Sequence, residues 1–480
     1  MIVRIAVGNV RRSIADFSVY FITLCFAACM LYSFTASTDY LVALDLTEDQ
    51  RAVYAQAGDV VRAFSVFTVV VFAFLVAYAN RFLVRRRKRE FALYHLLGMN
   101  ASFVSAILTI EAGVVSVCAL AAGIALGVAL SPVFNFVAAI VFGVPWTMAF
   151  AASGSAALWT CGSFVGITVL AGIVVVADVN RRTLLDLMYA ERAPERPRLR
   201  GRVSCALQMI AAALLLGAVW GICLLYPTYF VLLVLPLGFV ALFGTYFLFR
   251  VVTSVSSRMA RRSRRYLEGL RMVVARQFEA KVESSCVALA CVCVLVAAAV
   301  CMVCAGLALS VGVQGGAYAT DASAAFAAEG VSSTFALSVA PLAYVCLLYG
   351  LTFLVAAGAI LAIQQLSDAA DNRRAYELIA RLGADEGEMR RAVARQVGRY
   401  FTLPVVTALV HSVFGLQVIA LFALAAGAAS FKLIVGSAVL VVVAVMVGYY
   451  ALCTAACVRM LVTRTAPEAG RPAQHATAVA

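Results

Sequence analysis

Ten long apolar runs, separated by short polar segments, divide this chain of 480 residues. A helix needs about 20 consecutive apolar residues to cross a bilayer, and each run reaches that length. The runs leave 64% of the residues hydrophobic and only 13% charged, against roughly half and a quarter in soluble domains. A soluble enzyme, a nucleic-acid-binding domain and a secreted scaffold are therefore excluded. The sequence predicts an all-α polytopic membrane protein with about ten transmembrane helices.

The first apolar run is interpreted as a retained membrane anchor. Its apolar stretch, residues 17–34, is longer than the core of a signal peptide, and no clear small-x-small cleavage site follows it. The ten predicted spans are residues 17–37, 61–80, 103–133, 156–178, 204–225, 229–249, 286–310, 338–365, 398–425 and 433–457.

Basic residues gather between alternate apolar runs. The formal net charge is +14, and all 38 Lys and Arg residues except Arg51, Arg62 and Lys432 fall on one side of the predicted bundle. Cytoplasmic loops of membrane proteins carry such an excess of Lys and Arg. The pattern predicts a multi-pass protein of the cell (plasma) membrane with both termini in the cytoplasm. The basic segments between the termini are 81–100, 180–203, 250–285 and 366–400.

Two of these basic segments resemble each other at an offset of 285 residues. Residues 88–100 and 373–385 both contain apolar positions at helical spacing, followed by Gly98 and Gly383. A glycine in this place suits the left-handed residue that ends a helix. Asn100 and Asp385 then suit the N-cap of the next helix, and Glu388 would complete a capping box with Asp385. Each segment is predicted to form a short amphipathic helix, a glycine stop and a long membrane helix.

The exposed helices of these two segments have two interpretations. Each could lie on the inner leaflet, anchored through contacts between Arg side chains and lipid phosphates. The recurrence of the same pattern in both halves favours a docking surface for a cytoplasmic partner, because repeated units are frequent in transporters.

At these residues the chain resembles the FtsX-like permease family of ABC transporters, specifically the Bce-type permeases of antimicrobial-peptide resistance modules. In one respect the chain departs from the Bce pattern. Those permeases carry a sizeable extracellular domain between spans seven and eight, where this chain has only the segment 311–340. The stretches that carry the resemblance are residues 8–13, 16–21, 87–99, 368–383, 400–404 and 411–415.

The resemblance implies a ten-span permease that recruits two copies of a separate cytoplasmic ATP-binding subunit. A membrane sensor kinase is a second possible partner by the same resemblance. It divides the chain into an N-terminal part (1–60), a first FtsX-like repeat (61–180), a middle part with spans 5–7 (181–337), a second FtsX-like repeat (338–463) and a disordered cytoplasmic tail (464–480). By position, it places the docking residues at Arg89, Phe91, Leu93, Tyr94, Leu97, Gly98, Arg374, Tyr376, Leu378, Ile379, Leu382 and Gly383.

The chain has no phosphate-binding loop of its own. No GxxxxGK[ST] motif occurs, and none of the three Lys residues follows a Gly. The chain is therefore predicted not to be an enzyme and to bind no cofactor directly, while ATP and Mg²⁺ would bind to the partner subunit. The predicted function is the permease subunit that couples ATP hydrolysis to export, removal or release of an antimicrobial peptide or a lipid-linked envelope substrate.

Glu111 and His411, which lie within predicted spans, and Gln396, just before the ninth span, form a possible intramembrane polar site that supports a different class of function. Glu111, Gln396 and His411 could form a proton or cation site, since carboxylates within membranes are usually functional and a His can titrate near neutral pH. The chain would then be an ion-coupled secondary transporter. In the alternative interpretation, a neighbouring Arg satisfies Glu111 at the inner interface, and His411 is a hydrogen-bonded packing residue. A non-transporting scaffold or sensor subunit is a third class.

Three weaker patterns are interpreted as structural. Cys301 and Cys304 have CxxC spacing, but a zinc site needs four convergent ligands, so we interpret them as packing residues. Gly123 and Gly127 form a GxxxG that could be a helix–helix contact. The Arg residues in 258–265 are interpreted as a solvated, lipid-facing patch, with specific recognition of anionic lipid as the alternative.

Overall fold

The computed structural model describes most of the chain and shows it as helix. The described residues are 8–9, 14–42, 69, 72–73, 76–77, 80, 84, 90, 93–94, 96–142, 150, 152–180, 202–280, 282–314, 331–425 and 431–463. Within these ranges there is no strand, which confirms the all-α prediction. The predicted tail 464–480 and the docking residues Arg89 and Phe91 lie outside the described residues.

The described helices follow the apolar runs of the sequence. They are α2 (Ile14–Val42), α5 (Ala101–Phe142), α6 (Gly154–Asn180), α8 (Arg202–Leu225), α9 (Pro227–Leu232), α10 (Val234–Arg262), α11 (Arg271–Ala280), α12 (Val282–Gln314), α14 (Val331–Arg381), α15 (Glu386–Ala425) and α16 (Phe431–Val458), with the short segments η1 (Arg264–Leu267) and η2 (Arg459–Thr463).

The lengths of these helices suit a membrane protein. In the described part of the chain, eight helices are long and apolar enough to cross a membrane. They correspond to eight of the predicted spans, and α2 covers the first span at 17–37. The predicted span 61–80 falls mostly outside the described residues.

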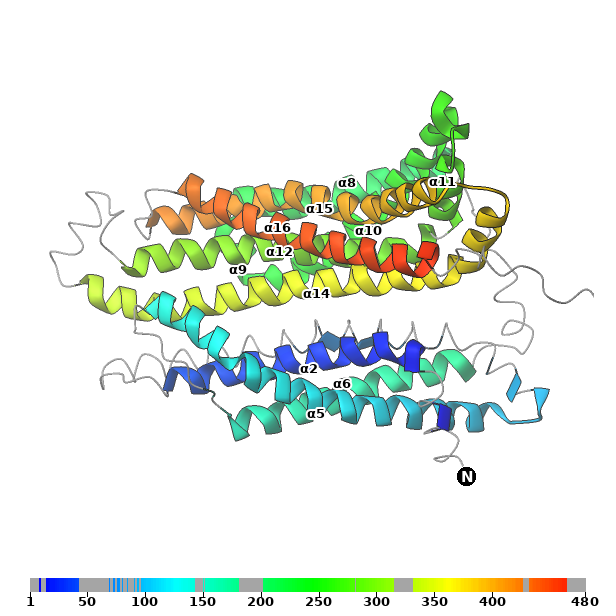
Figure 1. Cartoon of the computed structure of the whole chain (residues 1–480). Coiled ribbons are helices and arrows are strands. Elements are labelled where there is room, and N and C mark those ends of the chain that lie inside the picture. Colours follow the sequence, from blue (N-terminus) through cyan, green and yellow to red (C-terminus); the bar gives the residue numbers. More distant parts are fainter. Residues whose placement is uncertain are drawn as a thin grey trace, which may run out of the picture.

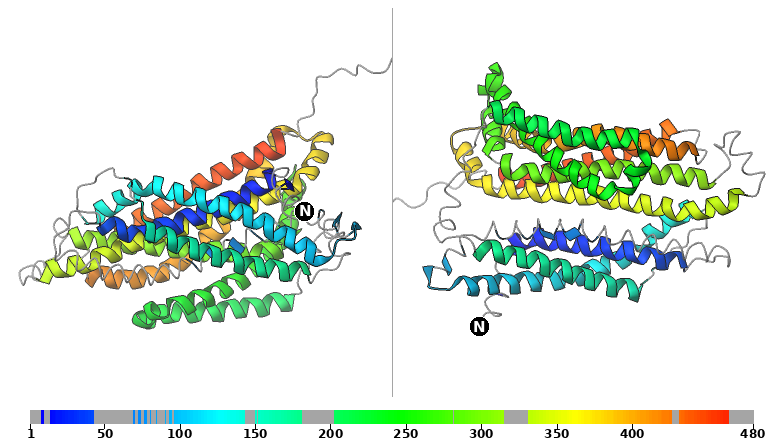
Figure 2. Two further views of the ribbon diagram at one scale, coloured as in Figure 1. Left: turned by 90° about the horizontal axis from the view of Figure 1, so that it is seen from below. Right: turned by 180° about the vertical axis from the view of Figure 1, so that it is seen from behind.

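The helices form two neighbouring groups, with α12 and α14 at the centre of the larger one. Helices α2, α5 and α6 pack against one another, while α8, α10, α12, α14, α15 and α16 form the second group (Figures 1 and 2). The most apolar windows of α12 and α14 are 61% and 67% buried, against 22–28% in the other six candidate spans. Most helices thus leave an apolar face for lipid, while α12 and α14 are largely covered by protein.

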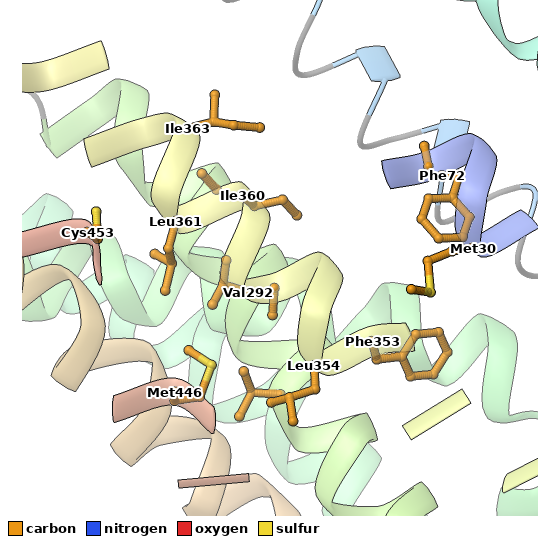
Figure 3. Packing of buried hydrophobic residues seen from close by; sticks show 14 of the residues in the cluster. Met30, Phe72, Val292, Phe353, Leu354, Ile360, Leu361, Ile363, Met446 and Cys453 are labelled. Atoms are coloured by element: carbon orange, nitrogen blue, oxygen red, sulfur yellow. The ribbon is translucent and has the colours of Figure 1, made fainter. Parts of the chain in front are cut away.

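Aliphatic, aromatic and sulfur-containing side chains fill the interior around α14. Leu354 and Leu361 of α14 lie on the side of Met446 and Cys453 of α16, whereas Phe353 lies on the side of Met30 of α2 (Figure 3). These side chains are buried. Helix α14 therefore joins the two groups, because its opposite faces pack into both.

The predicted GxxxG motif of α5 forms a close contact with α2. A Cβ atom on Gly123 would lie 2.6 Å from the Cβ of Ala28, and one on Gly127 would lie 2.5 Å from the ring of Tyr32. Such separations are shorter than van der Waals contact, so only glycine allows the two helices to approach this closely. The interpretation as a helix–helix contact is confirmed.

Helix α14 is longer than the sequence analysis predicted. It runs without a break for 51 residues, so residues 373–381 are its last turns rather than a separate short helix. The connecting segment 366–372 contains no Gly or Pro, the residues that most strongly interrupt a helix. Polar composition alone does not end a helix, and α14 therefore continues beyond its apolar part.

A buried carboxylate fixes the turn between α10 and α11. The Glu279 side chain is 2% exposed; it accepts a hydrogen bond from Arg261 Nε at 3.0 Å and another from the Ser257 hydroxyl. Burial alone would raise the pKa of Glu279, but the hydrogen bonds from Arg261 and Ser257 outweigh it and hold the pKa below the ordinary 4.5. Glu279 therefore stays ionised at neutral pH and clamps α11 to α10.

Candidate coupling surface

The two similar segments lie at the same end of the helix bundle. The turn before α5 and the turn between α14 and α15 are both at the right-hand end of Figure 1, where α11 also lies, and they share one end when the molecule is seen from behind (Figure 2). By the charge pattern of the sequence, this end is the predicted cytoplasmic side.

Both segments end in the same hydrogen-bonded motif. The backbone N–H of Met99 donates to the Tyr94 carbonyl at 3.0 Å, and 285 positions later the N–H of Ala384 donates to the Ile379 carbonyl at 3.3 Å. Such a bond, spanning a glycine with positive φ, defines the Schellman ending of a helix.

Gly98 and Gly383 adopt the left-handed backbone conformation that the sequence predicted. Their φ angles are +84° and +91°, and among the described residues only Gly269 shares a positive φ. A side chain at such φ values clashes with the backbone, so glycine is strongly favoured. The two segments therefore change direction sharply at the predicted positions.

The helices that follow also begin as predicted. Asn100 accepts backbone hydrogen bonds from Phe103 and Val104 through its carbonyl. Asp385 Oδ2 accepts from the N–H of Gly387 at 3.0 Å, and its carbonyl accepts from Met389. A side-chain acceptor at this place satisfies a backbone donor that the first turn of a helix leaves open. Asp385 is therefore the N-cap of α15.

Four leucines of the two segments expose their side chains at this end of the bundle. The exposed fractions are 57% for Leu93 and 76% for Leu97, and 59% for Leu378 and 87% for Leu382. Leu93 corresponds to Leu378 and Leu97 to Leu382 in the repeat. We call these four residues the twin leucine surface. Full burial of an exposed leucine side chain is favourable by roughly 1.5–3 kcal/mol. This surface therefore favours an apolar partner.

The other predicted docking residues contribute differently. Arg374 is exposed beside the leucines of α14. Tyr376 is only 1% exposed and belongs to the hydrophobic core, and Ile379 is partly buried against the same core. Tyr376 and Ile379 therefore hold the end of α14 in place, whereas the leucines and Arg374 face outward.

Tyr94 is connected to the membrane interior through Asn9. The Asn9 side-chain nitrogen donates to the Tyr94 hydroxyl at 3.0 Å and to Glu111 Oε1 at 2.8 Å. Glu111 is fully buried in α5. The donor to this carboxylate is a side-chain amide from a position 102 residues earlier in the chain. The N-terminal segment thus links the first docking segment to α5.

His411 is packed between helices by one hydrogen bond and an aromatic contact. Thr245 donates its hydroxyl proton to the Ala241 carbonyl at 2.7 Å, so its oxygen accepts from His411 Nε2, 3.0 Å away. The Trp220 ring lies 5.5 Å from the His411 ring. This arrangement places a ring proton on Nε2, and it agrees with the packing interpretation.

The structure shows Glu111 and His411 bonded to different residues. Glu111 bonds to Asn9, while His411 bonds to Thr245 of α10. Gln396 is buried on α15, but 15 residues separate it from His411, which is roughly 22 Å along a helix. Gln396 and His411 therefore lie well apart along α15.

The cysteines of the CxxC pair contact apolar neighbours. Cys304 is fully buried, and Cys301 lies against α15, where a Cβ on Gly415 would be 2.6 Å from its sulfur. In the part of the chain that the structure describes, no group of three His, Cys, Asp or Glu residues could hold a metal ion.

Comparison with known proteins identifies part of this architecture. Residues 62–184 match the family described as FtsX-like permease C-terminal, a range close to the predicted first repeat at 61–180. The chain therefore carries an FtsX-like permease domain, and the resemblance seen in the sequence is confirmed.

Three bacterial permeases are similar to parts of the chain. The uncharacterized ABC transporter permease YvcS of Bacillus subtilis is 23% identical over 268 residues, 56% of this chain and 40% of that protein. The bacitracin export permease protein BceB of Halalkalibacterium halodurans is 25% identical over 190 residues, and that of Bacillus subtilis is 24% identical over 187. Each of these two matches covers 39% of this chain and 28% of the BceB protein. The chain thus spans less than half the length of these relatives.

Proposed function

We propose that this FtsX-like permease chain is the membrane subunit of an ABC transporter, and that a separate ATP-binding subunit docks on the twin leucine surface. The observation that carries the proposal is the pairing of two Schellman turns with exposed leucines at the same end of the bundle. Two equivalent surfaces fit two copies of one partner, as the dimer of an ATP-binding subunit would provide.

The length of α14 favours a protein partner over the lipid surface. The polar part of this helix begins at Gln364, and Leu378 follows 14 residues later, about 21 Å along the axis. The headgroup region of a bilayer extends only about 5–8 Å beyond the hydrocarbon on each side. A helix that runs along the membrane normal would therefore carry Leu378 and Leu382 past the headgroups and into the cytoplasm.

The mechanism that this geometry supports is mechanical. ATP bound to the partner would close the partner dimer, and this closure would press on both parts of the twin leucine surface. Gly98 and Gly383 act as joints, and α5 and α15 act as the levers that begin directly after them. The Asn9 bridge transmits movement of the first segment to α5, and the continuous α14 transmits movement of the second segment to the core.

The substrate class follows from the relatives alone. Two of the similar proteins are named bacitracin export permeases, so we propose an antimicrobial peptide or a lipid-linked envelope component as substrate.

Affinity purification of the tagged chain from its native host in mild detergent tests the proposed function. We expect a protein with a phosphate-binding-loop ATPase motif to co-purify, identified by mass spectrometry. Recovery of the intact permease without any ATPase in several mild detergents would contradict the proposal. Transport that responds to protonophores and needs no ATP would instead indicate the secondary-transporter alternative.

A further inference from the structure

The two halves of the twin leucine surface differ at one exposed position. Leu96 of the first segment is 56% exposed, and it stands three residues after Leu93 and directly before Leu97, on the same side of the helical turn. The offset of 285 residues pairs Leu96 with Arg381, which is exposed as well. Two leucines are thus common to both halves, while the third position is a leucine in the first half and an arginine in the second.

The carboxylates near Arg381 in the sequence are occupied by other groups. Glu377, one turn earlier, pairs with Arg373 at 3.0 Å, and Asp385, four residues later, accepts from the backbone at the start of α15. Neither Arg381 nor the exposed Arg374 forms a salt bridge with any residue that the structure describes. The guanidinium group of Arg381 is therefore available to a partner.

The position of Arg381 constrains what can cover the second half. Arg381 follows Leu378 by three residues and directly precedes Leu382, so a partner that covers these two leucines also covers the guanidinium group. Burying a charge is unfavourable unless it is paired and hydrogen-bonded. A carboxylate satisfies a guanidinium group through two charge-assisted hydrogen bonds. The second half therefore fits a partner with an apolar groove that carries an acidic side chain.

We propose that the two halves are unequal docking sites for the two copies of the ATP-binding subunit. The first half binds one copy through its three exposed leucines. The second half binds the other copy through its two leucines and an ion pair from Arg381 to a carboxylate of that subunit. This inference rests on the proposed function. Because two copies of one subunit present the same groove, the change from leucine to arginine makes the two affinities differ in their dependence on salt.

Binding of the co-purified ATPase to the full chain in mild detergent, measured without nucleotide, tests the proposal. Leu97→Asp blocks the first half and leaves the second to be measured, and Leu382→Asp does the reverse. Between about 0.05 and 0.5 M NaCl, the affinity of the second half should fall about fivefold more than that of the first, because salt screens exposed ion pairs.

Exchanging the residue that distinguishes the halves should exchange their behaviour. In the Leu97→Asp background, the further change Arg381→Leu should remove the additional salt dependence of the second half. In the Leu382→Asp background, Leu96→Arg should give the first half the salt dependence of the second. Both exchanged side chains are exposed, so the fold should be preserved.

Arg390→Leu in the Leu97→Asp background is the matched control. It removes an exposed arginine of α15 that already pairs with Glu386, and it should leave the salt dependence unchanged. Equal salt dependence of the two halves, or no effect of Arg381→Leu, would overturn the inequality and leave the docking itself intact. Failure of the ATPase to bind wild type would overturn the proposed function together with this inference.

Discussion

The side-chain amide of Asn9 donates a hydrogen bond to Glu111 at 2.8 Å, and the same nitrogen lies 3.0 Å from the Tyr94 hydroxyl. One neutral residue near the start of the chain therefore connects the proposed docking segment to a buried carboxylate of α5. Because Glu111 is fully buried, its ionised form depends on such donors. The arrangement gives the carboxylate a structural role and makes the coupling between Tyr94 and α5 testable.

Replacing Asn9 by Asp should destabilise this connection. The substitution removes this donor and places a second carboxylate beside Glu111, and loss of one hydrogen bond to a buried carboxylate costs about 1–3 kcal/mol. We expect a lower melting temperature of the purified protein and weaker stimulation of the partner ATPase. Glu111→Gln should be tolerated, because its amide oxygen still accepts the hydrogen bond from Asn9. Loss of transport in Glu111→Gln with normal stability would instead support the ion-coupled transporter.

Alanine at Gly98 or Gly383 should strain the two turns. With φ angles of +84° and +91°, each substitution should cost about 1–2 kcal/mol. The double variant Gly98→Ala plus Gly383→Ala is expected to bind the partner but to uncouple ATP turnover from transport. Gly448→Ala is the matched control, because a Cβ at this position meets no atom within 4 Å. Full coupling in the double variant would show that the two glycines are not joints.

The packing of α2 against α5 should be sensitive to single methyl groups. Gly123→Ala places a Cβ 2.6 Å from both Ala28 Cβ and the Cys25 carbonyl oxygen, and such overpacking typically costs about 1–3 kcal/mol. Gly113→Ala, on the same helix, meets nothing within 4 Å and serves as control. Thermal unfolding in detergent should separate the two variants, and equal melting temperatures would contradict the close contact between the helices.

The Glu279 clamp should give a defined pH dependence. The pKa of Glu279 in the folded protein is below 4.5, so its contribution to stability is present above pH 4.5 and is lost as the pH falls through the folded pKa. Glu279→Gln should lower the melting temperature at pH 7. The difference from wild type should shrink only below pH 4.5. A difference that is constant from pH 7 to pH 3 would show that the carboxylate charge does not stabilise the turn.

The lengths of the apolar runs were sufficient to predict the helical membrane fold, because a helix that spans a bilayer needs a minimum number of apolar residues. The extent of α14 could not be predicted in this way. Its continuation to Arg381 depends on the absence of a helix-breaking residue in 366–372 and on the burial of Tyr376 and Ile379 against other helices. A polar segment between two apolar runs can be a loop or a helix, and only tertiary packing decides between them.

Local signals in the sequence located the turns of the candidate site but not its long-range contacts. Gly98, Gly383 and Asp385 were predicted from their neighbours because helix endings and N-caps are set by nearby backbone groups. The bond between Asn9 and Glu111 joins positions 102 residues apart, and nothing in the sequence pairs them. The outward face of the second docking segment likewise depends on the burial of Tyr376 and Ile379 against the core.

The affinity of the purified partner ATPase for this chain tests the proposed docking most directly. The variant Leu97→Asp plus Leu382→Asp places charges on the twin leucine surface, while Leu267→Asp changes an equally exposed leucine of η1 at the same end, at 78% exposure. All three side chains are exposed, so folding should be preserved. We predict at least tenfold weaker binding for the double variant and wild-type affinity for Leu267→Asp. Equal affinity of the ATPase for wild type and both variants would contradict docking on this surface.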